Sequence, residues 1–278
     1  MRTLIAGCGY VGTELGLLLG RAGHSVWGIR RGAETLPEPI RGISVDLLAP
    51  GLAEALPQVD RVVYAASADA SAPGPYRSAY VEGVVKLLDA LVGVGASVER
   101  FIFVSSTAVY GDAGGDWVDE DTLPAPESFR GEVVLEGEER ALSGPFPALV
   151  LRLGGIYGPG RTRLLERVRS GEAQCPEGPP IWSNRIHRDD AAGALAHLLE
   201  IESPERTYIG VDDEPAPLCD VYRYLAELLR APAPGVGGEG RSRRANKRCS
   251  NARLRATGYR FEYPSFREGY RTMVAETS

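Results

Sequence analysis

The stretch LIAGCGYVG, residues 4–12, constrains the fold of this 278-residue chain more than any other feature. Its three glycines, Gly7, Gly9 and Gly12, follow a predicted apolar strand and open a predicted apolar helix. Gly7 allows a tight turn, Gly9 leaves room for a pyrophosphate, and Gly12 lets the helix pack closely on the strand. The free N–H groups at the start of the helix favour an anion. We therefore expect a strand–turn–helix unit that binds a dinucleotide.

Short apolar runs alternate with amphipathic segments through the first half of the chain. This alternation predicts parallel strands joined by helices, and hence a doubly wound α/β sheet of the Rossmann type. The expected strands are residues 3–6, 25–29, 43–45, 61–66, 100–105 and 148–152, and the expected helices are residues 11–22, 76–94 and 130–142.

The pattern changes after residue 153, where prolines interrupt the apolar runs. Further helices are expected at residues 189–200 and 218–229. We expect a dinucleotide-binding domain over residues 1–153 and a smaller substrate lobe over residues 154–278. Within the lobe, roughly residues 186–210 are expected to return to the first domain.

The end of the second predicted strand bears on the choice of dinucleotide. In HSVWGIRR, residues 24–31, this strand ends on Arg30 and Arg31. A carboxylate here would accept hydrogen bonds from a free ribose 2′-OH, whereas guanidinium groups suit a 2′-phosphate. We therefore expect NADP in preference to NAD. The alternative is a solvated strand end, where arginine is common.

Composition limits the partners and the compartment. The net charge of −6 argues against a nucleic-acid surface. The basic run at residues 241–248 is expected to be a solvated loop, with a contact for a substrate phosphate as the alternative. Four cysteines without metal-ligand spacing and three histidines predict no metal site, and reduced cysteines are expected. No apolar run reaches the roughly 20 residues of a membrane span. Because the N-terminus enters the glycine motif directly, we expect a mature cytoplasmic protein.

Five further segments carry a resemblance to a known family. They are VDLLAP (45–50), VVYAASA (62–68), FVSSTAVYG (103–111), LRLGGIYGPGR (151–161) and NRIHRDDAAGAL (184–195). Together with the glycine motif, and in this order, they resemble the extended short-chain dehydrogenase/reductase family. The closest similarity is to its NAD-dependent epimerase/dehydratase branch.

The resemblance implies roles for individual residues. Asp46 would meet adenine, and residues 154–157 would lie near the nicotinamide. Ser106 matches the catalytic Ser/Thr that holds a substrate oxygen, with a strand-end hydroxyl as the alternative. The implied substrate contacts are Asn184, Arg185 and His187, and a buried structural role is the alternative for His187. The implied cofactor contacts are Gly7, Gly9, Tyr10, Val11, Gly12, Arg30, Arg31, Asp46, Leu47, Ala65, Ala66, Ser67, Leu153, Gly154 and Ile156.

The family's Tyr-x-x-x-Lys pair is missing from this chain. In FRGEVVLEGE, residues 129–138, the Tyr position holds Arg130 and the Lys position holds Val134. Arginine does not release its proton at a usable pH, and valine has no charge with which to lower the pKa of a neighbour. Tyr80 stands where the family usually has Asn. The chain therefore resembles an atypical member.

Other side chains are candidates for the missing proton transfer. Tyr110 and Tyr157 flank strand ends that are expected at the cleft, and Asp69 follows the fourth predicted strand. A tyrosine near its usual pKa of about 10 is an adequate proton donor but a poor base at neutral pH. This chemistry favours reduction of a carbonyl over epimerisation, which needs a base as well.

Three functions are therefore open. The leading hypothesis is an NADP-dependent oxidoreductase that acts on a small or nucleotide-linked carbonyl or hydroxyl substrate, with Ser106 polarising the substrate oxygen. The alternatives are a catalytically silent NADP-sensing regulator and a sugar-nucleotide epimerase or dehydratase. A monomer or a homodimer is expected, with a small molecule as the partner.

Overall fold

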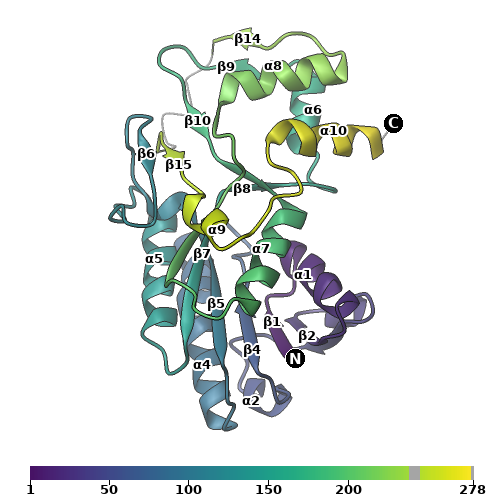
Figure 1. Cartoon of the computed structure of the whole chain (residues 1–278), viewed down its shortest axis with the longest axis vertical. Coiled ribbons are helices and arrows are strands. Elements are labelled where there is room, and N and C mark those ends of the chain that lie inside the picture. Colours follow the sequence, from purple (N-terminus) through teal and green to yellow (C-terminus); the bar gives the residue numbers. More distant parts are fainter. Residues whose placement is uncertain (238–244, 277–278) are drawn as a thin grey trace.

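One parallel sheet forms the centre of the molecule (Figure 1). The computed structural model describes residues 1–237 and 245–276, so residues 241–244 of the basic run lie outside the described residues. The seven strands run in the order β12-β7-β5-β4-β1-β2-β3. They are β1 (Arg2–Ala6), β2 (Ser25–Arg30), β3 (Arg41–Ser44), β4 (Arg61–Tyr64), β5 (Arg100–Ser106), β7 (Ala148–Leu153) and β12 (Thr207–Gly210).

This strand order confirms the predicted doubly wound sheet. The chain winds outward from β1 through β2 to β3, and then returns to the other side of β1 with β4. Ligands of such sheets bind at the carboxyl ends of the strands, next to the point where the direction reverses. That point lies between β1 and β4, whose residues Thr3 and Arg61 are paired in the ladder. The edge strand β12 was not among the predicted strands.

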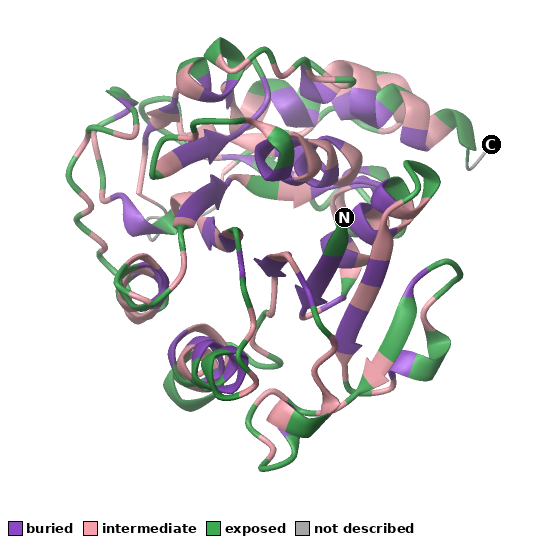
Figure 2. Ribbon diagram, turned by 60° about the horizontal axis from the view of Figure 1, so that its bottom comes forward, coloured by how far each residue is buried: buried purple, intermediate pink, exposed green. Residues whose placement is uncertain are grey.

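Helices cover both faces of the sheet because successive strand residues point to opposite sides. On one face, Ile5 of β1 packs with α1 (Tyr10–Arg21) and α7 (Arg188–Glu200). On the other face, Leu4 packs with α4 (Gly83–Gly93) and α5 (Phe129–Leu142). Figure 2 shows the buried strands between these helices. Burial on both faces explains why the strands are continuous apolar runs.

The helix predicted at residues 76–94 contains a π-helical turn. It consists of α3 (Pro73–Arg77), the π-turn η2 (Ser78–Glu82) and α4. The N–H of Gly83 donates to the carbonyl of Ser78, five residues earlier. The hydroxyl of Tyr64 donates to the carbonyl of Ala79 at 2.5 Å from the end of β4. A side-chain donor that reaches a helix carbonyl is a known cause of such a local opening.

A third apolar cluster lies away from the sheet. It is built on α6 (Arg163–Arg169), α8 (Leu218–Leu229) and α10 (Phe266–Glu276), which gather at one end of the molecule (Figure 1). A disulfide joins Cys175 to Cys219 in this part of the chain. This bond corrects the expectation of four reduced cysteines, whereas Cys8 and Cys249 are free and buried.

Short elements complete the described chain. The small ladders pair β8 with β11, β10 with β13, β14 with β9, and β15 with β6. These elements are α2 (Leu52–Ala55), β6 (Trp117–Val118), β8 (Gly155–Tyr157), β9 (Gln174–Cys175), β10 (Trp182–Ser183), β11 (Arg185–His187), β13 (Ala216–Pro217), β14 (Gly235–Val236), β15 (Arg248–Cys249), α9 (Ala252–Ala256), η1 (Ala33–Thr35) and η3 (Thr107–Val109). Over the described ranges, every helix is too short or too polar to cross a membrane.

Candidate dinucleotide and substrate site

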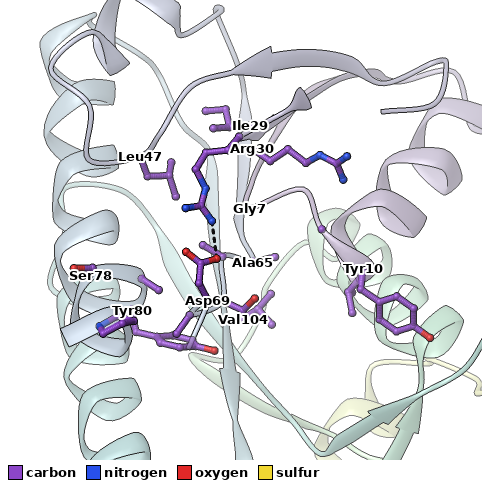
Figure 3. Close-up of a pocket in the computed structure, with 18 of the residues that line it drawn as sticks. Gly7, Tyr10, Ile29, Arg30, Leu47, Ala65, Asp69, Ser78, Tyr80 and Val104 are labelled. Atoms are coloured by element: carbon purple, nitrogen blue, oxygen red, sulfur yellow. Dashed lines mark hydrogen bonds and ion pairs between the residues drawn. The ribbon is translucent and has the colours of Figure 1, made fainter. Parts of the chain in front are cut away.

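A cavity of about 950 Å³ opens at the carboxyl ends of the central strands (Figure 3). Its walls come from the residues that end or follow β1, β2, β3, β4, β5 and β7, and from α3, η2 and β8. The implied cofactor contacts meet here, with the exception of Gly12. Those that line the cavity are Gly7, Gly9, Tyr10, Val11, Arg30, Arg31, Asp46, Leu47, Ala65, Ala66, Ser67, Leu153, Gly154 and Ile156.

The glycine turn has a separate structural requirement at each position. Gly7 has a φ of +80°, and a side chain there would collide with the backbone of Ala66. A Cβ at Gly12 would lie 2.9 Å from Cγ2 of Ile5, so this residue sets the approach of α1 to β1. At Gly9 the nearest atom to a Cβ would be 3.9 Å away. The turn therefore leaves open space only at Gly9, beside the cavity, where a pyrophosphate fits.

The start of α1 also fits an anion. Gly9 is its N-cap residue, and no side chain caps the helix in the described structure. Arg161 lies close by, with its guanidinium 4.2 Å from the centre of the Tyr10 ring. The uncapped N–H groups, the helix dipole and this guanidinium all favour negative charge. Sequence reasoning did not assign Arg161 to the site, although it lies within the matched segment 151–161.

Two arginines line the cavity at the end of β2. Arg30 donates from Nε to the carbonyl of Gly32 at 3.2 Å and also contacts the hydroxyl of Thr35. Arg31 forms an ion pair of 2.6 Å with Asp69, drawn as a dashed line in Figure 3. Both partners of that pair are about two-thirds exposed, with 64% of Arg31 and 67% of Asp69 accessible. An ion pair this exposed is weak, so another anion can easily replace the carboxylate of Asp69 beside Arg31.

The ends of β5 and β7 form the other part of the cavity. Ser106 lines it, and its Oγ accepts a hydrogen bond of 3.1 Å from the N–H of Ala108. The neighbouring Ser105 donates to Oε1 of Glu138 at 2.5 Å and is buried. The side chain of Ser106 therefore faces the cavity, whereas that of Ser105 is engaged with the protein interior.

The two tyrosines predicted as proton donors do not line the cavity. Tyr110 is buried, and its hydroxyl accepts a hydrogen bond of 2.7 Å from Nη1 of Arg152. Tyr157 is also buried and stacks on Tyr270, with ring centres 4.5 Å apart. Burial raises the pKa of Tyr110 to about 12 and raises the pKa of Tyr157 further. Their positions correct the expectation that they face the cleft.

The three residues predicted as substrate contacts are likewise outside the cavity wall. Asn184 bridges two backbone groups, donating to the carbonyl of Lys247 at 3.0 Å and accepting from the N–H of Cys249 at 2.7 Å. Arg185 contacts the hydroxyl of Ser183.

His187 is the N-cap residue of α7. Its Nδ1 accepts a hydrogen bond of 3.3 Å from the N–H of Asp189, and its ring centre lies 3.9 Å from that of Tyr263. Burial lowers the pKa of this imidazole to about 4. Within the described residues its Nε2 has no hydrogen-bond partner. The described contacts of His187 are thus made within the protein, and a substrate contact for it stays a prediction.

The positions of the missing Tyr and Lys are occupied by residues that make other contacts. Arg130 donates to the hydroxyl of Ser71, and Val134 is packed in the core with 3% exposure. Neither residue lines the cavity wall.

Tyr80, from the π-turn η2, does line the cavity. Figure 3 shows its ring extending into the cavity. Its carbonyl packs tightly against Gly137, one turn beyond Val134 on α5. Tyr80 therefore lies beside the segment in which the family carries its Lys, and sequence reasoning had noted it only as a lost Asn.

The described residues contain no group of three or more His, Cys, Asp or Glu placed to hold a metal ion. The fold and the glycine-lined cavity are those of a Rossmann-type dinucleotide-binding protein. The chain belongs to the NAD dependent epimerase/dehydratase family, whose model matches residues 3–210.

Curated relatives extend over most of the chain. It is 30% identical to a 3-diazoavenalumate denitrifying reductase from a Streptomyces species, over 84% of this chain and 83% of the relative. It is also 30% identical to protein YeeZ of Escherichia coli strain K12, over 95% of this chain and 96% of that protein.

Solved structures share the fold along the whole chain. A Methylobacillus flagellatus protein, assigned to the NAD-dependent epimerases/dehydratases, is 37% identical with a TM-score of 0.82, over 99% of this chain and 98% of that one. MoeE5, solved with UDP-glucuronic acid and NAD, is 24% identical with a TM-score of 0.86, over 100% and 99% of the two chains. At that identity, the similarity to MoeE5 is one of fold.

Proposed function

We propose that this protein is an NADP(H)-dependent oxidoreductase that works in the direction of reduction. The observation that carries the proposal is the pair of guanidinium groups, Arg30 and Arg31, on the cavity wall at the end of β2. In this fold that strand end meets the adenosine ribose, and guanidinium groups there favour a 2′-phosphate. The exposed ion pair between Arg31 and Asp69 is weak enough to yield to a phosphate.

The chain's own residues supply the rest of the binding site. The uncapped start of α1 and the open side of Gly9 would hold the pyrophosphate. Leu153, Gly154 and Ile156 would pack against the nicotinamide, which supplies a hydride when it is bound in reduced form. Ser106 would orient the substrate at this end of the cavity. The lobe over residues 154–278, apart from the segment near 186–210, would bind the remainder of the substrate.

The reductive direction is favoured over epimerisation for a chemical reason. Epimerisation through an oxidised intermediate requires a residue that first removes a proton and later returns it. The family's pair for this task is replaced by Arg130 and Val134, and neither lines the cavity. A curated relative at 30% identity is named as a reductase.

Calorimetric titration with NADPH and NADH tests the cofactor. Arg30→Ala and Arg31→Ala are expected to weaken NADPH binding about tenfold or more and NADH binding only slightly, since only the former carries a 2′-phosphate. Arg223→Ala is a matched control, because Arg223 is an exposed arginine on α8, outside the cavity wall. Equal weakening of both dinucleotides would contradict the phosphate role.

Turnover separates an oxidoreductase from an NADP-sensing regulator. Absorbance of NADPH would be followed with aldehydes, ketones and keto-sugar nucleotides. Consumption that is lost in Ser106→Ala supports the oxidoreductase. Tight binding of NADPH without turnover of any substrate supports the regulator.

A further inference from the structure

Beside the expected nicotinamide position, the described cavity wall offers only weak acids as proton donors. Two serine hydroxyls lie at the end of β5. The hydroxyl of Ser105 donates to Glu138, and the hydroxyl of Ser106 is an alcohol and therefore a very weak acid. Tyr80 also lines this part of the cavity, and burial raises the pKa of its phenol to about 12. No lysine is present to lower that pKa, because Val134 takes its position.

The same replacement changes the charge of the site. The family's Lys places a cation beside the nicotinamide position, and such a cation repels a positively charged substrate. Here that position is apolar, and Arg130 is directed toward Ser71 rather than into the cavity. Asp69 adds a carboxylate to the cavity wall, where it is paired with Arg31. The described wall therefore has no lysine beside Tyr80, and its arginines come from the end of β2 and from the segment after β8 (Arg30, Arg31 and Arg161).

Tyr80 presents an aromatic ring in this space (Figure 3). Its ring centre lies 5.4 Å from that of Tyr76, which in turn makes an edge contact of 5.5 Å with Phe129. The π-face of a tyrosine attracts a cation by about 0.5–2 kcal/mol, depending on how far the pair is removed from water. An aromatic ring at this place stabilises positive charge where the family's Lys opposes it.

We infer that the substrate carries a positively charged, electron-poor centre, of the diazonium or iminium type, which this site reduces without a proton from the protein. The inference rests on the proposed NADP(H) function and deepens it by naming the substrate class. The Streptomyces relative, named for denitrifying a diazo compound, belongs to the same chemistry.

The electron balance of such a reaction closes without an acid. A hydride that adds to an iminium carbon forms a C–H bond, and the C=N π electrons become the lone pair of a neutral amine. A hydride that replaces a diazonium group forms a C–H bond, while N₂ leaves with the electrons of the broken C–N bond. The hydride donor is oxidised by two electrons in both cases. A carbonyl, in contrast, becomes an alkoxide that requires a proton.

Binding of unreactive probes tests the charge preference without turnover. The probes are 4-(trimethylammonio)benzoate and its neutral-headed isostere 4-tert-butylbenzoate, titrated by calorimetry into the NADPH-saturated protein, in which the nicotinamide ring is uncharged. The ammonium compound is expected to bind about tenfold more tightly. Tyr80→Leu removes the aromatic face and is expected to abolish most of this preference, whereas Tyr80→Phe retains the face and is expected to retain more of it.

Turnover with a matched pair of reactive compounds tests the chemistry. The 4-carboxybenzenediazonium ion and 4-carboxybenzaldehyde share one frame and differ in whether reduction requires a proton. With NADPH deuterated at C4, we expect N₂ release and benzoate that carries one deuterium, at least tenfold faster than without protein. Reduction of the aldehyde is expected to be at least tenfold slower than that of the diazonium ion.

The outcomes separate this inference from the proposed function. Absence of NADPH binding would overturn both. If NADPH binds but the aldehyde is the better substrate, or neither compound is reduced, the inference is wrong and the cofactor proposal stands. Tighter binding of the tert-butyl probe would also overturn the inference. Equal impairment of diazonium reduction in Tyr80→Phe and Tyr80→Leu would do the same, because the hydroxyl of Tyr80 and not its ring would then matter.

Discussion

Arg152 and Glu138 form a buried, two-pronged ion pair between β7 and α5, with the shorter contact at 2.7 Å. Arg152 also donates a hydrogen bond to the hydroxyl oxygen of Tyr110, and Glu138 accepts a hydrogen bond from the hydroxyl of Ser105. The pair therefore holds both the tyrosine that was predicted to be catalytic and a serine at the cavity wall. It fixes the end of β5, on which Ser106 depends for its position.

Removal of Glu138 is expected to destabilise the fold strongly. Glu138→Ala leaves the guanidinium of Arg152 buried without a counterion, at a cost of about 3–5 kcal/mol. Glu136→Ala is the control on the same helix, because its ion pair with Arg77 is exposed and contributes less than about 1 kcal/mol. Urea denaturation measures both free energies of unfolding. Similar losses in the two variants would contradict the buried pair's role.

Two glycines of the turn are expected to respond differently to alanine. Gly7→Ala forces a side chain into a φ of +80° and against Ala66, and about 2 kcal/mol or more of stability is expected to be lost. Gly9→Ala adds a methyl group that points into open space, so the free energy of unfolding is expected to change by less than about 1 kcal/mol. NADPH affinity, however, is expected to fall at least tenfold, since the added methyl meets the pyrophosphate. Thermal unfolding and calorimetry distinguish the two effects. Unchanged affinity in folded Gly9→Ala would place the pyrophosphate elsewhere.

Asp69 competes with a phosphate for Arg31. Asp69→Asn removes this competitor, and NADPH affinity is expected to rise about threefold, in line with the strength of an exposed ion pair. The gain is expected to shrink at high salt, where exposed charges are screened. Calorimetry at low and high ionic strength measures it. A fall in affinity would show that Asp69 itself holds the dinucleotide.

His187 is expected to make stability depend on pH. Burial lowers its pKa to about 4 in the folded protein, whereas the unfolded chain has a pKa near 6.5. Between pH 4 and pH 6.5, the unfolded state binds a proton at His187 that the folded state does not. The contribution of His187 to the free energy of unfolding is therefore complete above pH 6.5 and is lost as pH falls toward 4. It amounts to about 3 kcal/mol.

Urea denaturation at several pH values checks the role of His187. His187→Gln removes the titrating group, and its stability is expected to fall less steeply between pH 6.5 and 4 than that of the parent protein. Burial raises the pKa values of Asp190 and Asp212, but these groups are present in both proteins and cancel in the comparison. Parallel slopes would assign the pH dependence to other groups.

Much of the fold was predictable because parallel strands buried on two faces are continuous apolar runs. Helix α8 occupies the residues predicted for it, 218–229. Strand β12 was missed because TYIG, residues 207–210, is short and lies between the polar stretches SPER (203–206) and DDE (212–214). The disulfide was not predictable, because Cys175 and Cys219 are 44 residues apart and meet only through tertiary packing.

The dinucleotide half of the site was more predictable than the substrate half for a geometric reason. Strand ends meet at one edge of a parallel sheet, so residues placed there by sequence converge in space. The direction of a side chain just beyond a strand end depends on its partners. Tyr110 turns toward Arg152, and Tyr157 turns toward Tyr270. Neither partner lies near its tyrosine in the sequence.

The π-turn at Ser78–Glu82 contains one residue more than an α-helical turn would. An uninterrupted α-helix would rotate Tyr80 by about 100° relative to the core-facing residues Val84 and Leu87. The π-turn therefore lets Tyr80 reach the cavity wall while its ring still packs against the core, and Val84 and Leu87 keep their buried positions. A substitution at position 80 would thus alter the cavity wall and its contact with the core together.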